Sequence, residues 1–139
     1  MSNADPPDTA VLVDDRQDLA VDTDAVVDLA LRCLRGEDAA GELSLSFVTL
    51  EEMADLHERY MHEQGPTDVL SFPQDEDGLL GDVVICPAYA ARNNDDLDAE
   101  IRLLVVHGIL HLVGHDHEED GERAVMWAKQ ESYTGVRVP

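Results

Sequence analysis

Four of the six histidines in this chain fall in one run, HGILHLVGHDH, between His107 and His117. If the run is helical up to Gly114, His107 and His111 lie four residues apart and stack on one face of the helix. Two imidazoles placed in this way can bind one metal ion. Gly114 can adopt a positive φ and turn the chain so that His117 approaches the same ion. Three protein nitrogens and an open fourth position are typical of a catalytic zinc site.

The spacing H-x3-H-x2-G-x2-H is also that of metzincin-type metalloproteases. In those enzymes a glutamate follows the first histidine and acts as general base, whereas this chain has Gly108 at that position. The glycine argues against peptidase chemistry. Zinc alone lowers the pKa of a bound water from 15.7 to about 7, so other hydrolytic reactions stay open. The same three histidines would also hold nickel, cobalt or iron.

The residues around the ligands offer several ways to move protons. His115, Asp116 or a substrate hydroxyl could serve, and the sequence does not choose between them. Asp116 could instead accept the second N–H of a ligand imidazole, or it could be a turn residue after Gly114. We expect His115 to lie outside the ligand set, because a fourth protein ligand would close the site.

The elements that must position these residues follow from hydrophobic periodicity and turn signals. We expect strands at 10–13, 43–47, 68–72 and 80–86, the last two as a hairpin, and helices at 23–36, 49–65, 87–95, 98–114 and 120–134. This order predicts a single α+β domain, in which a small mixed β-sheet is packed with about five helices and the metal-binding helix is central. Residues 1–9 are expected to be a disordered lead to the domain at 10–139.

Two helices carry more specific expectations. Asp98 is expected to cap the histidine-bearing helix. In the second helix, Met53, Leu56 and Tyr60 are expected to line one apolar face before Gly65 ends it.

The chain is strongly acidic: 9 basic and 31 acidic side chains give a net charge of −22. Such a surface repels nucleic acid at low ionic strength, and it resembles the composition of salt-adapted proteins. In molar salt the Debye length falls to about 3 Å, so an RNA partner is not excluded. The simpler interpretation is a solvation coat that is unrelated to mechanism.

Cysteine usage and hydropathy indicate the compartment. Cys33 and Cys86 lie far apart without a CxxC pairing, which suits free thiols in a reducing environment, although one disulfide stays open. The N-terminus is polar and acidic, unlike a secretory signal or a transit peptide. The longest apolar stretch, 103–114, is too short to span a bilayer. We therefore expect a soluble, cytoplasmic protein with no membrane partner.

Three blocks together resemble one known family, the YbeY endoribonucleases of ribosomal RNA maturation. The run at 107–117 fits the family pattern HGxLHLxGxDH, with His115 where tyrosine is more usual. The blocks GPTDVLSFP at 65–73 and LGDVVIC at 80–86 follow in the family's order and spacing. The resemblance spans nearly the whole domain.

This resemblance implies a metal-dependent, single-strand-specific endoribonuclease that acts in 3′-end maturation of small-subunit (16S) ribosomal RNA and in ribosome quality control. It implies one zinc-type ion held by His107, His111 and His117. Its expected partners are single-stranded ribosomal RNA, the small ribosomal subunit and associated assembly factors. The segment 66–72 would form one wall of the active-site cleft.

The chain departs from the family at Met61, where an arginine that can bind phosphate is common. Arg59 lies two residues earlier but points in a different direction on a helix. Its alternative role is a solvated ion pair on the helix surface. The candidate catalytic residues besides the ligands are therefore Arg59, His115 and Asp116.

Two further functions stay open. A zincin-like metallopeptidase would share the ligand spacing, although Gly108 speaks against it. A non-enzymatic ribosome-assembly factor would use the metal only to stabilise its fold, which suits the acidic surface and Met61.

Overall fold

A computed structural model of the chain describes residues 9–74, 76, 78–115 and 119–136. Its elements are β1 (Ala10–Asp15), α1 (Thr23–Gly36), β2 (Glu42–Phe47), α2 (Leu50–Met61), β3 (Val69–Pro73), β4 (Leu79–Ile85), α3 (Pro87–Ala90), α4 (Leu97–Leu112) and α5 (Asp120–Thr134). Their order confirms the predicted α+β class. The expected disordered lead lies, apart from Thr9, outside the described residues.

The four strands form one mixed sheet in the order β1-β2-β4-β3. β1 pairs with β2 in parallel and β2 with β4 in parallel, whereas β3 and β4 are antiparallel. The predicted hairpin of β3 and β4 is therefore confirmed. β3 is an edge strand, so one side of it is free of strand partners within the described sheet.

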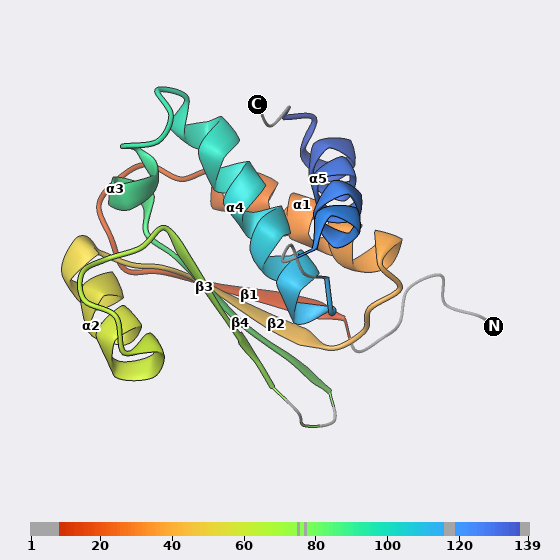
Figure 1. Ribbon diagram of the computed structural model, residues 1–139, viewed down its shortest axis with the longest axis horizontal. Coiled ribbons are helices and arrows are strands. Elements are labelled where there is room, and N and C mark those ends of the chain that lie inside the picture. Colours follow the sequence, from red (N-terminus) through yellow and green to blue (C-terminus); the bar gives the residue numbers. More distant parts are fainter. Residues whose placement is uncertain (1–8, 75, 77, 116–118, 137–139) are drawn as a thin grey trace.

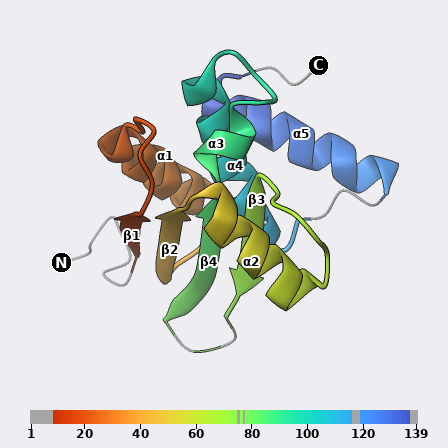
Figure 2. The ribbon, with the colours of Figure 1, turned by 90° about the vertical axis from the view of Figure 1, so that its left-hand side faces the viewer.

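Helices cover the two faces of the sheet unequally. The helices α1, α4 and α5 lie over one face, whereas α2 lies near one end of the sheet (Figures 1 and 2). Side-chain alternation along the strands directs one set of residues toward α1 and α4, where they form the main core. Its fully buried members include Leu43, Leu45, Phe47, Val83, Ile85, Val105, Ile109 and Leu110. A smaller cluster on the α2 side contains Val48, Met53, Leu70, Val84 and Cys86.

The N-cap of the histidine-bearing helix α4 lies two residues earlier than expected. Asp96, and not Asp98, is the N-cap, and its Oδ1 accepts a hydrogen bond from the Ala99 amide at 3.1 Å. Asp98 lies in the first turn, where a negative charge favours the positive end of the helix dipole. The helix ends at Leu112, and Gly114 has φ of +103°, which confirms the expected positive φ.

The expected end of α2 at Gly65 is wrong. His62 adopts the left-handed conformation and ends the helix after Met61, and its amide donates to the Glu58 carbonyl at 3.0 Å. Because α2 covers only part of the sheet, Tyr60 is 56% exposed rather than buried. It contacts Phe72 edge to face, with ring centroids 5.3 Å apart.

Both cysteines are free, as expected, and both are buried. Burial raises the pKa of the Cys33 thiol to about 12, so this thiol stays protonated at neutral pH. In the part of the chain that the structure describes, no helix has the length and apolar character needed to cross a membrane.

Candidate metal centre

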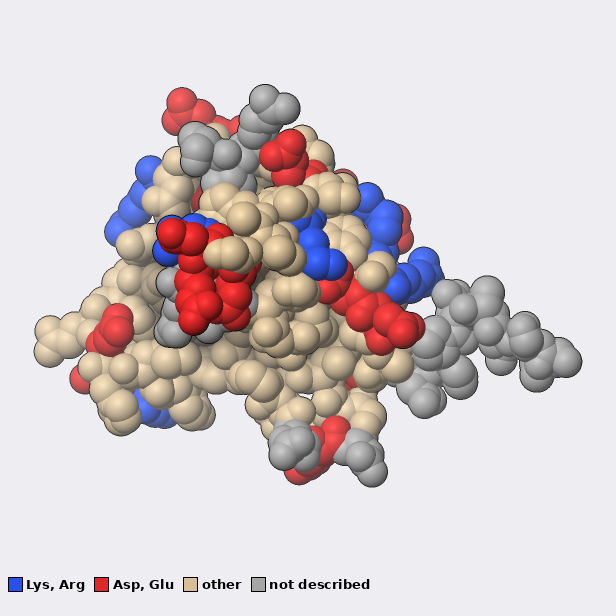
Figure 3. Space-filling model, turned by 45° about the vertical axis from the view of Figure 1, so that its right-hand side comes forward, with Lys and Arg blue, Asp and Glu red and all other residues tan. Residues whose placement is uncertain are grey.

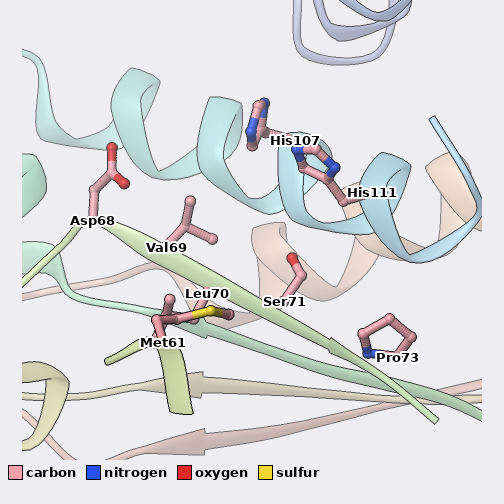
Figure 4. A pocket seen from close by; sticks show the side chains of 8 residues that line it. All are labelled: Met61, Asp68, Val69, Leu70, Ser71, Pro73, His107 and His111. Carbon is pink, nitrogen blue, oxygen red and sulfur yellow. The ribbon is translucent and has the colours of Figure 1, made fainter. Parts of the chain in front are cut away.

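His107 and His111 project from the same side of α4, as their spacing predicts. Their ring centroids are 4.7 Å apart and their planes meet at 78°. Both side chains line one cavity (Figure 4). His117 and Asp116, the expected third ligand and its neighbour, lie outside the described residues. Within the described residues, no group of three His, Cys, Asp or Glu could hold a metal ion.

The cavity has a volume of about 460 Å³ and lies between α4 and the edge strand β3. It is lined by Met61, Asp68, Val69, Leu70, Ser71, Pro73, His107 and His111. Figure 4 shows the two histidines on one side and the β3 residues facing them across the cavity. The segment 66–72 thus contributes one wall, in the position that the resemblance implied.

Gly108 lets α4 approach this wall closely. A Cβ at this position would lie 2.6 Å from Val83 Cγ1 and 3.3 Å from Ser71 Oγ. The Ser71 hydroxyl also donates to the Gly108 carbonyl at 3.2 Å. The sequence indicates only that Gly108 lacks the catalytic carboxylate of the peptidases. In the structure, the absence of a side chain at Gly108 allows α4, with His107 and His111, to lie close to β3.

The sequence did not point to Gln130, which contacts His107 from α5. The Gln130 side-chain oxygen lies 2.6 Å from His107 Nδ1, and the Trp127 ring lies edge-on to the His107 ring at 6.2 Å. Local patterns could not find this pair, because the two residues are 23 positions apart on different helices.

Arg59 lies on the exposed surface of α2. Its Nη2 is 2.8 Å from Asp55 Oδ2, one helical turn away, and both side chains are about 60% exposed. Such pairs contribute about 0.3–0.5 kcal/mol. The residues that line the cavity include Met61 but not Arg59. A catalytic role for Arg59 stays a prediction. Its alternative role, a surface ion pair, is supported by the contact with Asp55.

His115 belongs to a cluster around a buried carboxylate, which we call the Glu37 cluster: Glu37, His115, Lys129 and Tyr133. Glu37 Oε1 lies 2.7 Å from His115 Nε2, and Oε2 accepts from Lys129 Nζ at 2.9 Å and from the Tyr133 hydroxyl at 2.6 Å. The Glu37 side chain is only 5% exposed. The cluster connects the end of α1 and the helix α5 to the chain that follows α4. The cluster therefore fixes the position of His115, which lies two residues before His117 in the sequence.

Protonation of Glu37 should weaken the fold in acid. Burial raises the pKa of Glu37, but hydrogen bonds from Tyr133, Lys129 and His115 outweigh it and lower the pKa from 4.5 to about 2. The carboxylate therefore stabilises the fold fully above pH 4.5, and this contribution of about 3 kcal/mol is lost as the pH falls toward 2. Urea unfolding of the wild type and of Glu37→Gln should differ at neutral pH and converge in acid.

A matched control is Glu58→Gln, which changes an exposed carboxylate on α2. It should leave the pH profile of the unfolding free energy unchanged. A wild-type profile that runs parallel to that of Glu37→Gln down to about pH 2 would contradict the assigned role of the cluster.

The donor set of the cavity fits a transition-metal ion of the zinc type. Imidazole nitrogens are preferred ligands of zinc, and two of them lie side by side at the cavity wall. A proton on Nδ1, donated to the Gln130 oxygen, places the lone pair of a neutral His107 imidazole on Nε2. Metal-ligating histidines commonly have such a partner on their second nitrogen.

Comparisons with known proteins agree with this architecture. The sequence model of the family described as endoribonuclease YbeY matches residues 9–135. The chain is 51% identical over 104 residues to endoribonuclease YbeY of Thermobifida fusca, covering 64% of this chain and 67% of that protein. It is 42% identical over 130 residues to endoribonuclease YbeY of Streptomyces coelicolor, covering 79% of each.

A solved structure has the same fold. The solution structure of a Thermotoga maritima protein superposes with a TM-score of 0.65 and 27% sequence identity, covering 89% of this chain and 86% of that one.

Proposed function

Since the chain belongs to the YbeY endoribonuclease family, we propose that it is a metal-dependent endoribonuclease that cleaves single-stranded ribosomal RNA. The family supports the endoribonuclease role. The observation that carries the metal dependence is the pair of imidazoles, His107 and His111, at the wall of an open cavity of about 460 Å³. A nuclease that works on a flexible single strand needs such an accessible cleft.

His107, His111 and His117 would hold one zinc-type ion. The chemistry that such an ion supplies when bound is Lewis acidity toward water and toward a phosphoryl oxygen. The helix α4 would orient the first two ligands, and the 2.7 Å contact of Glu37 with His115 fixes a residue two positions before the third in the sequence.

Two further side chains at the cavity suit an RNA substrate. Ser71 donates its hydroxyl proton to the Gly108 carbonyl, so its lone pairs are available to accept a hydrogen bond from a ribose hydroxyl. Asp68 is the one carboxylate among the described residues that line the cavity. Its carboxylate can take up a proton from attacking water and release it later.

The cavity offers little positive charge of its own. Among the described residues that line it, none is an arginine or lysine, and Met61 occupies the position where arginine is common in the family. Figure 3 shows acidic side chains in several groups on one face of the molecule, with basic ones between them. With a net charge of −22, the protein should bind RNA weakly at low ionic strength.

The decisive experiment measures cleavage of a single-stranded ribosomal RNA fragment by zinc-loaded and chelator-treated protein. The salt concentration is raised from about 0.1 M to 1 M, which shortens the Debye length from about 10 Å to 3 Å. We expect cleavage only with metal, faster at high salt, and absent on the same sequence annealed to its complement. Addition of zinc after chelation should restore the rate.

Absence of cleavage by the zinc-loaded protein at every salt concentration would contradict the proposal. It would favour a non-enzymatic assembly factor, whose metal only stabilises the fold, and Met61 in the cavity is the observation that keeps this second candidate open. A peptidase finds no support, because position 108 has glycine in place of the general-base glutamate, and a Cβ at this position would already lie 2.6 Å from Val83 Cγ1.

The proposed biological setting is the cytoplasm, in 3′-end maturation of 16S ribosomal RNA and in ribosome quality control. The proposed partners are the small ribosomal subunit and its assembly factors. These assignments depend on family membership and on the open cleft beside β3.

A further inference from the structure

Gln130 is a polar residue at a position where an apolar one would be expected. It lies on α5 one turn after Met126, which is fully buried in the main core. Gln130 itself is only 2% exposed. Burying a side-chain amide without a hydrogen bond costs free energy. A buried glutamine therefore needs a hydrogen-bond partner close to it.

That partner is His107. The Gln130 side-chain oxygen lies 2.6 Å from His107 Nδ1, a short hydrogen bond between α5 and α4. A carbonyl oxygen can only accept, so the proton of this bond is carried by Nδ1 of His107. In a neutral imidazole the other nitrogen, Nε2, then has a lone pair and no proton.

The His107 ring is also constrained by its neighbours. The His111 ring lies edge-on to it at 4.7 Å, and the Trp127 ring, also from α5, lies edge-on at 6.2 Å. Rotation of the ring would break the bond to Gln130 and disturb both contacts. The helix α5 therefore supplies the acceptor and part of the enclosure for a side chain on α4.

We propose that Gln130 is a positioning residue, which holds the proton of His107 on Nδ1 and so presents the Nε2 lone pair to a metal ion in the cavity. The inference rests on the proposed function, since it assigns the second nitrogen of one proposed ligand. Gln130 itself touches neither substrate nor metal. Its effect is on which tautomer and which ring orientation His107 adopts before any ion arrives.

The test begins with the wild-type protein without metal. Long-range ¹H–¹⁵N NMR of the His107 ring should report the Nδ1–H tautomer. In Gln130→Met, which keeps the length of the side chain but loses the oxygen, the ring should show a mixture of tautomers. The zinc dissociation constant, measured by competition with a chelator, should rise about 10–100-fold. Gln130→Glu, which keeps an acceptor, should stay near the wild-type affinity.

Thr134→Val is the matched control. Thr134 is the other buried polar residue of the described chain, and its hydroxyl donates to the Gln130 backbone carbonyl at 2.6 Å. It should lower the free energy of unfolding but leave zinc affinity and the tautomer unchanged. A purely structural role of Gln130 would make the two variants behave alike.

Two results would overturn the proposal: an Nε2–H tautomer in the wild type, or unchanged zinc affinity in a folded Gln130→Met. If Gln130→Met does not fold, the proposal is tested by the tautomer of the wild-type His107 ring and by the zinc affinity of Gln130→Glu. Failure of the proposed function is seen separately, as zinc-loaded wild-type protein that cleaves no RNA. In that case the tautomer and affinity results would still test Gln130.

Discussion

Replacing His111 by alanine should abolish both zinc binding and RNA cleavage. His111 is the i+4 partner of His107 on α4, and both line the same cavity. Losing one of three ligands should cost more than the roughly 10–100-fold in metal affinity that changes around a ligand cost. The fold should persist, because His111 is only half-buried and alanine favours a helix. Zinc content per chain and cleavage of single-stranded ribosomal RNA are the two measurements.

The matched control is His62→Asn, which removes an exposed histidine that does not line the cavity. Asparagine tolerates the left-handed conformation of His62, whose φ is +58°. This variant should retain zinc and activity. Normal cleavage by a metal-free His111→Ala protein would refute the metal-dependent mechanism. That result would still be consistent with the endoribonuclease role, but without a bound metal ion.

Gly108→Ala should destabilise the protein although it lies within a helix. Alanine normally stabilises a helix relative to glycine by about 0.5–1 kcal/mol. Here the added Cβ would lie 2.6 and 3.1 Å from the two Val83 methyl groups, in the fully buried core between α4 and β4. Overpacking of this kind costs about 1–3 kcal/mol, so the net effect should be a loss of stability. Urea unfolding of metal-free protein measures it.

Gly121→Ala, at a second glycine within a helix, should have the opposite effect on stability. Nothing lies within 4 Å of a Cβ at Gly121, so this variant should gain stability from helix propensity alone. If Gly108→Ala were equally stabilising, α4 would not depend on its close approach to β4. Gly108→Glu, which would recreate the peptidase pattern, should be the least stable of these variants and should show no peptidase activity.

Much of the element order was predictable because it depends on local periodicity. The alternation in β2 and the positive φ of Gly114 are properties of short segments, and both appear in the structure. Errors fell at helix ends. Asp96 and Asp98 are chemically equivalent candidates for a cap, and only the packed helix shows which one it uses.

The exposure of Tyr60 shows a second limit of pattern analysis. An apolar stripe indicates which face of a helix could be buried, but not how much of a sheet the helix covers. α2 lies near one end of the sheet, so Met53 is buried whereas Tyr60, nearly two turns later, is largely exposed. Met61, which follows it, lines the cavity instead.

The sequence was enough to predict the shared helix face of His107 and His111, the β3–β4 hairpin and the family. Each of these features depends on residues a few positions apart or on a sequence motif. The tertiary structure shows which side chains of the expected wall line the cavity with the histidines, among them Asp68 and Ser71. It also places Gln130 against His107 and shows that Gly108 packs closely against β4. The physical reason is that such contacts join residues far apart in the chain, and side-chain packing between helices and sheet decides them.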